Sequence, residues 1–382
     1  MLTQEQNERL TKVGPGTPCG NLLRHYWQAL CPAGEITAEK PKKRVRILGE
    51  DLLVYRGDDG KVSCIAEHCL HRRASLYFGF IEPGGIRCCY HGWKYDAEGK
   101  CVDRPFETQK ADNLCLPSYP LQELGGLLFV YMGPKTSALP ALPRWDVMAR
   151  EDGKRTIVVL PEHTCNWLQI QENTVDSVHT YYLHGHMSAV NNLPTLATGR
   201  YFYRPIESYD WGLCEWGVTK TLVYGGDKPE IEVRPPLIFP NILRIPEGPL
   251  EALHFRVPID DTHTRIFWVG FVPGKGTGTT FEYSPDEAME DEDKLLQTFY
   301  GQDRIVWETQ GAIFDRTLEV LGATDKGIVM YRRMLAEQIE RVERGEAPTV
   351  AVVPDDAKDT MITFESTTRP VADGIEHVFA AN

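Results

Sequence analysis

The chain has 382 residues, of which 42% are hydrophobic and 25% charged, and this composition predicts a globular protein with room for two hydrophobic cores. Its formal net charge of −13 argues against a nucleic-acid-binding surface, and the basic run at residues 40–44 is too short to change that expectation. No run of eighteen apolar residues occurs, residues 1–10 are polar, and the ten cysteines come without an export signal, so we expect a cytoplasmic protein with neither a membrane span nor a signal peptide.

The first part of the chain predicts short helices followed by strands. Thr3 can cap a helix, the Gly- and Pro-rich residues 14–18 end it, and a second short helix is expected around residues 22–30. From Arg44 onward the apolar residues follow the periodicity of strands. The predicted strands are residues 45–48, 52–55, 62–65 and 127–131, with a hairpin at residues 95–101. The Pro-rich residues 139–143 indicate a linker or a domain edge.

Two cysteine–histidine pairs lie within this strand-rich stretch. One residue separates Cys69 from His71, and two residues separate Cys88 from His91, so each pair can face a metal from its own loop. Two thiolates and two imidazoles suit zinc or an iron–sulfur cluster, and a Rieske [2Fe–2S] cluster uses two cysteines on one iron and two histidines on the other. Structural zinc sites more often have two to four residues within each pair, so the one-residue gap favours the cluster over zinc.

A further group of metal-binding side chains follows in residues 166–184. On a helix, Asp176 and His179 share one face because they are three residues apart. His179 and His184 are five apart, which on a regular α-helix separates them by about 140°, so the helix must bulge or end between them if both bind one metal. Two imidazoles and one carboxylate on one side of Fe(II) leave positions open for dioxygen and substrate. The alternative is a polar helix face or a buried histidine whose hydrogen bonds are satisfied.

These motifs resemble those of a known family. Residues 69–76 and 88–96 resemble the two cluster loops of Rieske non-haem iron oxygenases, the α subunits of aromatic ring-hydroxylating systems. The Asp-x-x-His-x-x-x-x-His run at residues 176–184 resembles the mononuclear iron motif of the same family. Residues 10–27 resemble the start of its phthalate dioxygenase-like branch.

The resemblance implies a role for each of these side chains. The [2Fe–2S] cluster would be bound by Cys69, His71, Cys88 and His91, and the mononuclear Fe(II) by His179, His184 and a later carboxylate. Asp303, at the head of a predicted helix at residues 303–310, fits the family position of that carboxylate, and Asp315 and Asp293 are weaker candidates. The alternative role of Asp303 is a helix N-cap or a salt bridge. Asp176 would hydrogen-bond His179 on one side and a cluster histidine of a neighbouring subunit, His91 by motif position, on the other.

The resemblance also implies an α+β fold, with an all-β Rieske domain and a catalytic domain in which helices cover an antiparallel, helix-grip-like sheet. We expect an N-terminal helical segment at residues 1–40 that packs on the catalytic domain, the Rieske domain at residues 41–143 and the catalytic domain at residues 144–382. The strand-rich residues 201–272 would floor the substrate pocket. Apolar residues at helical spacing predict a C-terminal helix at residues 326–344.

Arginines in or beside this sheet are candidates for holding an acidic substrate. They are Arg204, Arg234, Arg244 and Arg256. A guanidinium that points inward can bind a carboxylate through two hydrogen bonds, although most arginines in such a sheet lie at its surface or edge. We expect at least one of the four to bind an acidic aromatic substrate, with Arg244 as the first candidate.

Together these features predict a terminal oxygenase that uses O2 and supplied electrons to hydroxylate an aromatic compound, first of all by cis-dihydroxylation of an aromatic carboxylate. Monooxygenation, such as O-demethylation or hydroxylation, is the alternative, and a Rieske electron carrier is disfavoured by the motif at residues 176–184. No Gly-x-Gly-x-x-Gly stands between a strand and a helix, so a separate NAD(P)H-dependent flavin or iron–sulfur reductase is needed, with or without a ferredoxin. The resemblance further implies a trimer or a multiple of it, because the two sites of one subunit lie far apart in this family.

Overall fold

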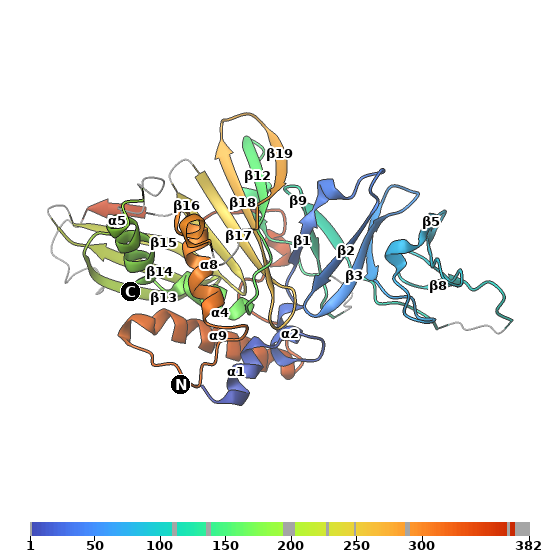
Figure 1. Ribbon diagram of the computed structural model, residues 1–382, viewed down its shortest axis with the longest axis horizontal. Coiled ribbons are helices and arrows are strands. Elements are labelled where there is room, and N and C mark those ends of the chain that lie inside the picture. Colours follow the sequence, from blue (N-terminus) through green and yellow to red (C-terminus); the bar gives the residue numbers. More distant parts are fainter. Residues whose placement is uncertain are drawn as a thin grey trace.

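The computed structural model describes residues 2–108, 113–134, 139–193, 203–226, 229–247, 250–286, 291–364 and 367–370. Figure 1 shows a small all-β part at one end of an elongated molecule and a larger part, built on one broad sheet with helices against it, at the other end. The predicted α+β fold class is confirmed by this arrangement. Within the described residues, no helix is both long and apolar enough to cross a membrane.

Short antiparallel sheets carry the two cysteine–histidine pairs. The first sheet contains β2 (Lys42–Ile47), β3 (Glu50–Arg56) and β4 (Val62–Ala66), and the second β5 (Phe80–Glu82), β6 (Gly85–Arg87), β7 (Lys94–Tyr95) and β8 (Cys101–Asp103). Their shared core includes the buried side chains of Leu53, Tyr55, Ile65, Ile86 and Tyr95. The strands and the hairpin predicted for this stretch are confirmed.

A third sheet links the all-β part to the rest of the molecule. It has the order β1 (Gln28–Pro32), β10 (Leu127–Val130), β9 (Leu121–Leu124). Phe129 of β10 packs edge-to-face on Phe255 of the large sheet, with ring centroids 5.4 Å apart. The helix predicted around residues 22–30 is therefore wrong beyond residue 23, because α2 (Pro18–Leu23) ends there and residues 28–32 pair with β10. A short apolar run does not distinguish a buried helix from a buried strand.

The large sheet has nine strands, eight of them in the order β13, β14, β15, β16, β17, β18, β12, β19. Their bounds are β12 (Gly153–Val159), β13 (Ile206–Cys214), β14 (Gly217–Tyr224), β15 (Glu230–Ile238), β16 (Ile242–Glu247), β17 (Leu250–Pro258), β18 (Thr264–Pro273) and β19 (Gly278–Tyr283). The ninth strand, β21 (Thr367–Pro370), pairs with β15. Among the described residues all pairings of this sheet are antiparallel except that of β12 with β19. The predicted strand-rich region is confirmed over its described residues, which exclude 201, 202, 227, 228, 248 and 249.

Helices pack against this sheet and carry the second metal motif. The α-helices are α1 (Gln4–Thr11), α2, α3 (Asp146–Ala149), α4 (Trp167–Val175), α5 (Met187–Val190), α7 (Glu292–Leu296), α8 (Phe299–Thr309) and α9 (Lys326–Glu343), and η3 (Thr180–His186) is a π-helix. Short 3-10 helices are η1 (Ala33–Glu35), η2 (Leu76–Phe78), η5 (Ala323–Asp325) and η6 (Asp355–Ala357), and a parallel pair is formed by β11 (Arg144–Trp145) and β20 (Met361–Ile362). The predicted C-terminal helix is confirmed as α9, whose Tyr331, Leu335 and Ile339 are buried in the main core.

Candidate metal centres

The two cysteine–histidine pairs meet at the end of the all-β part. The Cys69 and Cys88 thiols are buried, whereas the His71 and His91 rings are exposed, and the centroids of the two rings lie 4.5 Å apart. The structure therefore brings together all four predicted cluster ligands, with the sulfur side facing the core and the imidazole side facing solvent. Cys89, by contrast, is exposed.

Backbone hydrogen bonds fold each pair into a tight loop. The N–H of Arg73 donates to the carbonyl of Cys69, and the N–H of Gly92 to that of Cys88. Gly92 has a φ of +77°, and a side chain there would also press on Pro105, so glycine is needed at this turn. Backbone hydrogen bonds and the glycine thus define the shape of these loops.

Aromatic side chains support the same site. The Trp93 ring stacks on His71, with centroids 4.8 Å apart and planes 7° from parallel. The Tyr95 hydroxyl lies 3.2 Å from Cys69 Sγ and accepts a hydrogen bond from the N–H of Leu70 at 3.0 Å. A Cys69 thiolate can only accept, so with a metal bound the Tyr95 hydroxyl would donate its proton to the sulfur.

The donor set fits a cluster with two thiolate and two imidazole ligands. Burial raises the pKa of the Cys88 thiol, and the neighbouring Cys69 adds to the effect. The Cys88 thiol is therefore poorly ionised by itself and needs a cation to become a thiolate. The loops supply soft sulfur ligands inside and imidazoles outside, which suits a [2Fe–2S] cluster of the Rieske type.

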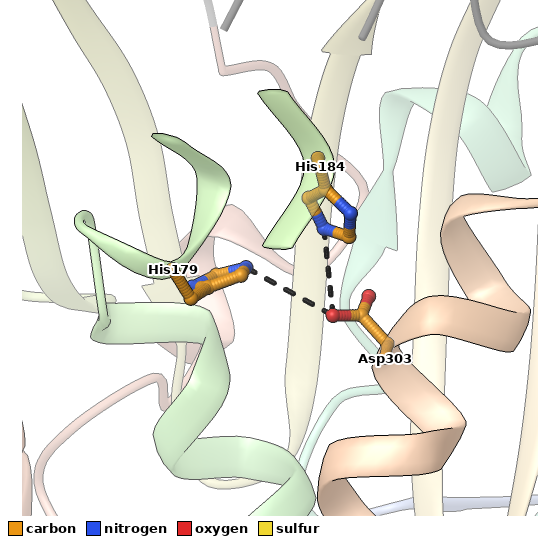
Figure 2. Close-up of side chains that lie close together, drawn as sticks. All are labelled: His179, His184 and Asp303. Carbon is orange, nitrogen blue, oxygen red and sulfur yellow. Dashed lines mark ion pairs between the residues drawn. The ribbon is translucent and has the colours of Figure 1, made fainter. Parts of the chain in front are cut away.

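The second centre is formed by residues from two elements that lie far apart in the sequence. His179 and His184 come from the segment after α4, and Asp303 from α8 (Figure 2). The Oδ1 atom of Asp303 is 3.4 Å from His184 Nε2 and 4.0 Å from His179 Nε2. One ligand atom from each residue lies within 4.8 Å of the others, so the three predicted ligands converge on one point.

A π-helix solves the spacing problem posed by the two histidines. Helix α4 ends at Val175, Asp176 is extended, and η3 follows directly after His179. In a π-helix the hydrogen bonds join residues five apart, so the turn is wide enough to bring residues five apart close to the same face. The rings of His179 and His184 accordingly lie edge to face with centroids 5.3 Å apart. The predicted irregularity between them is confirmed.

The structure places Asp176 beside His179. One carboxylate oxygen of Asp176 accepts from the N–H groups of Val178 and His179, and the other lies 3.7 Å from His179 Nδ1. Burial opposes ionisation of Asp176, but these hydrogen bonds and the positive charge that His179 can carry lower its pKa to about 2. An anionic Asp176 can orient His179, whereas its contact with a neighbouring subunit stays a prediction.

Asp303 lies inside a helix and does not begin one. Thr298 caps α8, which starts at Phe299, so the predicted helix start at residue 303 and the alternative N-cap role of Asp303 are both wrong. Asp303 also accepts a hydrogen bond from Asn173 Nδ2 at 3.4 Å. Although burial opposes its ionisation, His184 and His179 lower its pKa.

The two weaker carboxylate candidates are outside this group. Asp315 accepts hydrogen bonds from the N–H and hydroxyl of Thr317 and shapes a turn after α8. Asp293 lies in the short helix α7, which Asp291 caps. The described residues that could hold a metal with Asp303 are therefore His179 and His184.

The sheet presents buried basic side chains toward the second centre. Lys220 of β14 is directly opposite Arg234 of β15, and the Lys220 ammonium donates to the carbonyl of Thr174 in α4. Burial and the charge of Arg234 lower the pKa of Lys220 to about 7. On β17, Arg256 donates to the carbonyl of Ile170 in the same helix. The floor below α4 is thus lined with basic side chains.

His254 adds a neutral polar group to this floor. Burial and the charge of Arg256 lower the pKa of His254 to about 3, so its ring is uncharged near neutral pH. Its Nε2 is buried and has no hydrogen-bond partner among the described residues. Sequence reasoning missed His254. The signal was the alternation of His254 and Arg256 with apolar residues at 253, 255 and 257, which is an unusual pattern for a buried strand.

Arg244 is not grouped with the three iron-ligand candidates. Its guanidinium lies 3.2 Å from Asp146 Oδ2 and 2.6 Å from Glu251 Oε2, and only 3% of the residue is exposed. A substrate carboxylate would have to compete with two carboxylates of the protein. The assignment of Arg244 to substrate binding stays a prediction.

The two candidate centres of one chain occupy different ends of the molecule. Figure 1 shows β5 and β8, beside the cysteine–histidine loops, at the end of the molecule away from α8 and α4. Electrons that move between the centres of one chain would therefore have to cross the body of the protein.

Two segments of the chain match known protein families. Residues 26–120 match the Rieske [2Fe-2S] domain, and residues 279–373 match the family described as LigXa C-terminal domain like. The first match includes all four predicted cluster ligands, and the second includes Asp303.

Full-length similarity extends to curated proteins and to solved structures. The chain is 36% identical to the 5,5'-dehydrodivanillate O-demethylase oxygenase subunit of Sphingobium sp. (strain NBRC 103272 / SYK-6), over 94% of this chain and 85% of that protein. It is 30% identical to the phthalate 4,5-dioxygenase oxygenase subunit of Pseudomonas putida, over 91% and 88%. The oxygenase in the reduced oxygenase–ferredoxin complex of carbazole 1,9a-dioxygenase has the same fold, with a TM-score of 0.56, 21% identity, and coverage of 87% of this chain and 93% of that one.

Proposed function

Because the chain belongs to the Rieske non-haem iron oxygenases, as an oxygenase (α) subunit, we propose that it oxidises an aromatic carboxylate with O2 and electrons from a separate reductase. The observation that carries this proposal is the convergence of His179, His184 and Asp303 within 4.8 Å on elements far apart in the sequence. Two imidazoles and one carboxylate suit Fe(II) and leave coordination positions open. With the [2Fe–2S] cluster and the Fe(II) bound, the protein would store one electron at the cluster and activate dioxygen at the mononuclear iron.

An aromatic acid is the substrate class that the site favours. Arg234 and Arg256 bring positive charge to the floor below α4, and protonated Lys220 adds to it, so a substrate carboxylate would gain more there than a neutral ring. The two relatives described above are named for aromatic carboxylates, dehydrodivanillate and phthalate. Among the arginines, Arg234 is the better candidate to bind the acid, because its charge acts on His184 and, among the described residues, it pairs with one carboxylate, that of Glu232 at 3.2 Å, whereas Arg244 pairs with two.

O-demethylation is the first candidate reaction. The relative with 36% identity is an O-demethylase subunit, and the C-terminal residues 279–373 match a LigXa-like domain. In this reaction a methoxy methyl carbon is hydroxylated and leaves as formaldehyde, so a phenol remains. The unpartnered Nε2 of His254 could donate or accept a hydrogen bond at a phenolic or methoxy oxygen.

Cis-dihydroxylation is the second candidate, supported by the similarity to the phthalate 4,5-dioxygenase subunit. Both reactions need the same ligands, so the lining of the pocket and not the iron site decides between them. Both also consume two electrons and two protons for each O2.

The electrons have to come from outside the chain. We infer a separate NAD(P)H-dependent reductase, with or without a ferredoxin, and the carbazole dioxygenase complex is a case in which a ferredoxin meets such an oxygenase. Since the two centres of one chain lie at different ends of the molecule, we also propose a ring of subunits, a trimer or a multiple of it. Asp176 of one subunit would then lie next to His91 of the next.

The decisive experiment uses ¹⁸O2. Protein reconstituted with iron and sulfide, shown to carry a Rieske-type signal by electron paramagnetic resonance, is supplied with a flavin reductase and a panel of methoxylated and unsubstituted aromatic acids. O-demethylation gives formaldehyde that is released with one labelled oxygen and a phenol whose oxygen is unlabelled, whereas cis-dihydroxylation gives a diol with two labelled oxygens. If fully loaded protein oxidised no aromatic acid but did oxidise neutral aromatics, the carboxylate proposal would be rejected.

The arginine assignments are tested with the same assay. Arg234→Met should raise the apparent KM for an aromatic acid by about 10-fold or more, as expected for the loss of a charge-assisted hydrogen bond. The apparent KM for a neutral analogue should change little. Arg244→Met is the parallel variant. A larger effect at Arg244 than at Arg234 would return the substrate contact to Arg244.

A further inference from the structure

Gln302 lies between one iron-ligand candidate and the end of a neighbouring helix. Its side chain is fully buried in α8, directly before Asp303. Its Oε1 is 2.9 Å from His184 Nδ1, and its Nε2 donates to the carbonyl of Leu296, at the end of α7, at 3.1 Å. One side chain thus connects α7, α8 and the π-helix η3.

The contact with Leu296 fixes which way the amide of Gln302 points. A backbone carbonyl can only accept a hydrogen bond, so the NH2 group must face Leu296 and the oxygen must face His184. An amide oxygen can also only accept. His184 therefore carries its proton on Nδ1 and donates it to Gln302.

This proton position determines what the other ring nitrogen can do. With the proton on Nδ1, the lone pair of the neutral ring is on Nε2, and Nε2 is the atom that faces Asp303 Oδ1 at 3.4 Å. Two acceptor atoms that face each other at this distance are stabilised by a cation between them. The ring of His184 is therefore held in the tautomer that a metal needs.

We propose that Gln302 is a positioning residue that sets the tautomer and the ring orientation of His184 for iron binding. The inference rests on the iron site of the proposed function. It adds a difference between the two histidines, because His179 Nδ1 lies beside the carboxylate of Asp176, whereas His184 Nδ1 meets a neutral amide. Orientation of His184 therefore comes without a second negative charge beside Asp303.

The sequence alone gives little sign of this role. Gln302 is a polar residue in the middle of a helix, next to the predicted ligand Asp303, and it has no spacing relation to His184, which is 118 positions away. Its buried amide becomes informative only when both of its partners are known.

The test compares Gln302→Leu with Gln302→Glu. Leucine removes the acceptor at similar size, whereas glutamate keeps an acceptor oxygen but loses the donor to Leu296. The mononuclear site of each variant, emptied by chelation, is titrated anaerobically with Co(II), and binding is followed by visible absorption. Gln302→Leu should weaken Co(II) binding by about 10- to 100-fold, and Gln302→Glu by only a few-fold.

Gln169 provides the matched control. It is a buried glutamine of α4 that donates to the carbonyls of Trp307 and Gly311 and so also holds α8, but it contacts no iron-ligand candidate. Gln169→Leu should affect stability without changing Co(II) affinity more than a few-fold. Equal losses in Gln302→Leu, Gln302→Glu and Gln169→Leu would mean that Gln302 only supports the fold, and the proposal would be wrong.

Nitrogen NMR gives a second readout that does not depend on activity. In metal-free protein labelled with ¹⁵N-histidine and held above pH 8, His184 should have its proton on Nδ1, and Gln302→Leu should mix the two tautomers. A proton on Nε2 in the unsubstituted protein would overturn the proposal. If the unsubstituted protein bound no Co(II) and His179→Ala changed nothing, the iron site itself would be rejected, which is a distinguishable result.

Discussion

Replacing Glu172 should destabilise the catalytic part of the protein and, with it, the helix that leads into the iron motif. Glu172 lies in α4 with its carboxylate between two guanidiniums, at 2.8 Å from Arg316 and 2.6 Å from Arg332. Arg332 also pairs with Glu319, and the four side chains are each at most 8% exposed. Two positive and two negative charges thus balance in a buried cluster.

The expected magnitude follows from that balance. Glu172→Gln keeps the shape of the side chain but leaves one net positive charge buried, and removing one partner of a buried ion pair costs about 3–5 kcal/mol. The backbone carbonyl of Glu172 accepts from the N–H of Asp176, so a loosened α4 should also lower iron occupancy. The free energy of unfolding is measured by urea titration with tryptophan fluorescence, and the iron content by a chelator assay.

Two further variants separate charge from a general effect of substitution. Glu343→Gln breaks an exposed pair with Arg9 and should cost at most about 1 kcal/mol. Glu172→Met combined with Arg316→Met removes one charge of each sign and should recover most of the loss, because the pair of Glu319 and Arg332 remains. A Glu172→Gln variant no less stable than Glu343→Gln would refute the reasoning, as would a double variant that recovers nothing.

Three other outcomes can be checked directly. Tyr95→Phe removes the hydroxyl that contacts Cys69 Sγ, and the loss of one hydrogen bond of about 1 kcal/mol to a cluster sulfur should lower the one-electron potential by roughly 40–60 mV. Protein-film voltammetry measures this potential, and an unchanged value would contradict the assignment. Burial opposes ionisation of Glu308, but its hydrogen bonds lower its pKa from 4.5 to about 2, so the ionised carboxylate contributes at most about 3 kcal/mol to the free energy of unfolding above pH 4.5, and this contribution is lost as the pH falls toward 2. The difference in free energy of unfolding between the protein and its Glu308→Gln variant should therefore shrink over that pH range, and a constant difference would count against the assignment. His179→Ala should abolish product formation and mononuclear iron binding while the Rieske signal persists, and loss of that signal would mean that the two centres do not fold independently.

The cluster loops could be predicted from the sequence because each contains its own ligand pair. Cys69 and His71, like Cys88 and His91, are positioned by a single turn, so their local spacing carries the information. The same holds for His179 and His184, for which helix arithmetic required an irregularity. That arithmetic did not say which irregularity, since a break and a π-helix satisfy it equally.

Side chains positioned by tertiary contacts were harder to predict. Asp303 was chosen by resemblance, and the start of its helix was misplaced because Thr298 gives a weaker signal than an aspartate. Gln302 was missed because its partners lie on other elements, and His254 because its burial depends on how the sheet packs. The choice of Arg244 could not be checked against Asp146 and Glu251 before the sheet was known, since strand register decides which charges meet.

The π-helix has a consequence for how such sites are recognised and how they change. The hydrogen bonds of a π-helix span one residue more than those of an α-helix. Deleting one residue of η3 between His179 and His184 would therefore change the spacing of the two histidines from five to four, the spacing that suits a regular α-helix. Searches that accept only spacings of three or four residues would pass over this chain. The same turn offers protein engineers a place where a single-residue deletion alters the bite of a metal chelate while α8, and the carboxylate it carries, stays where it is.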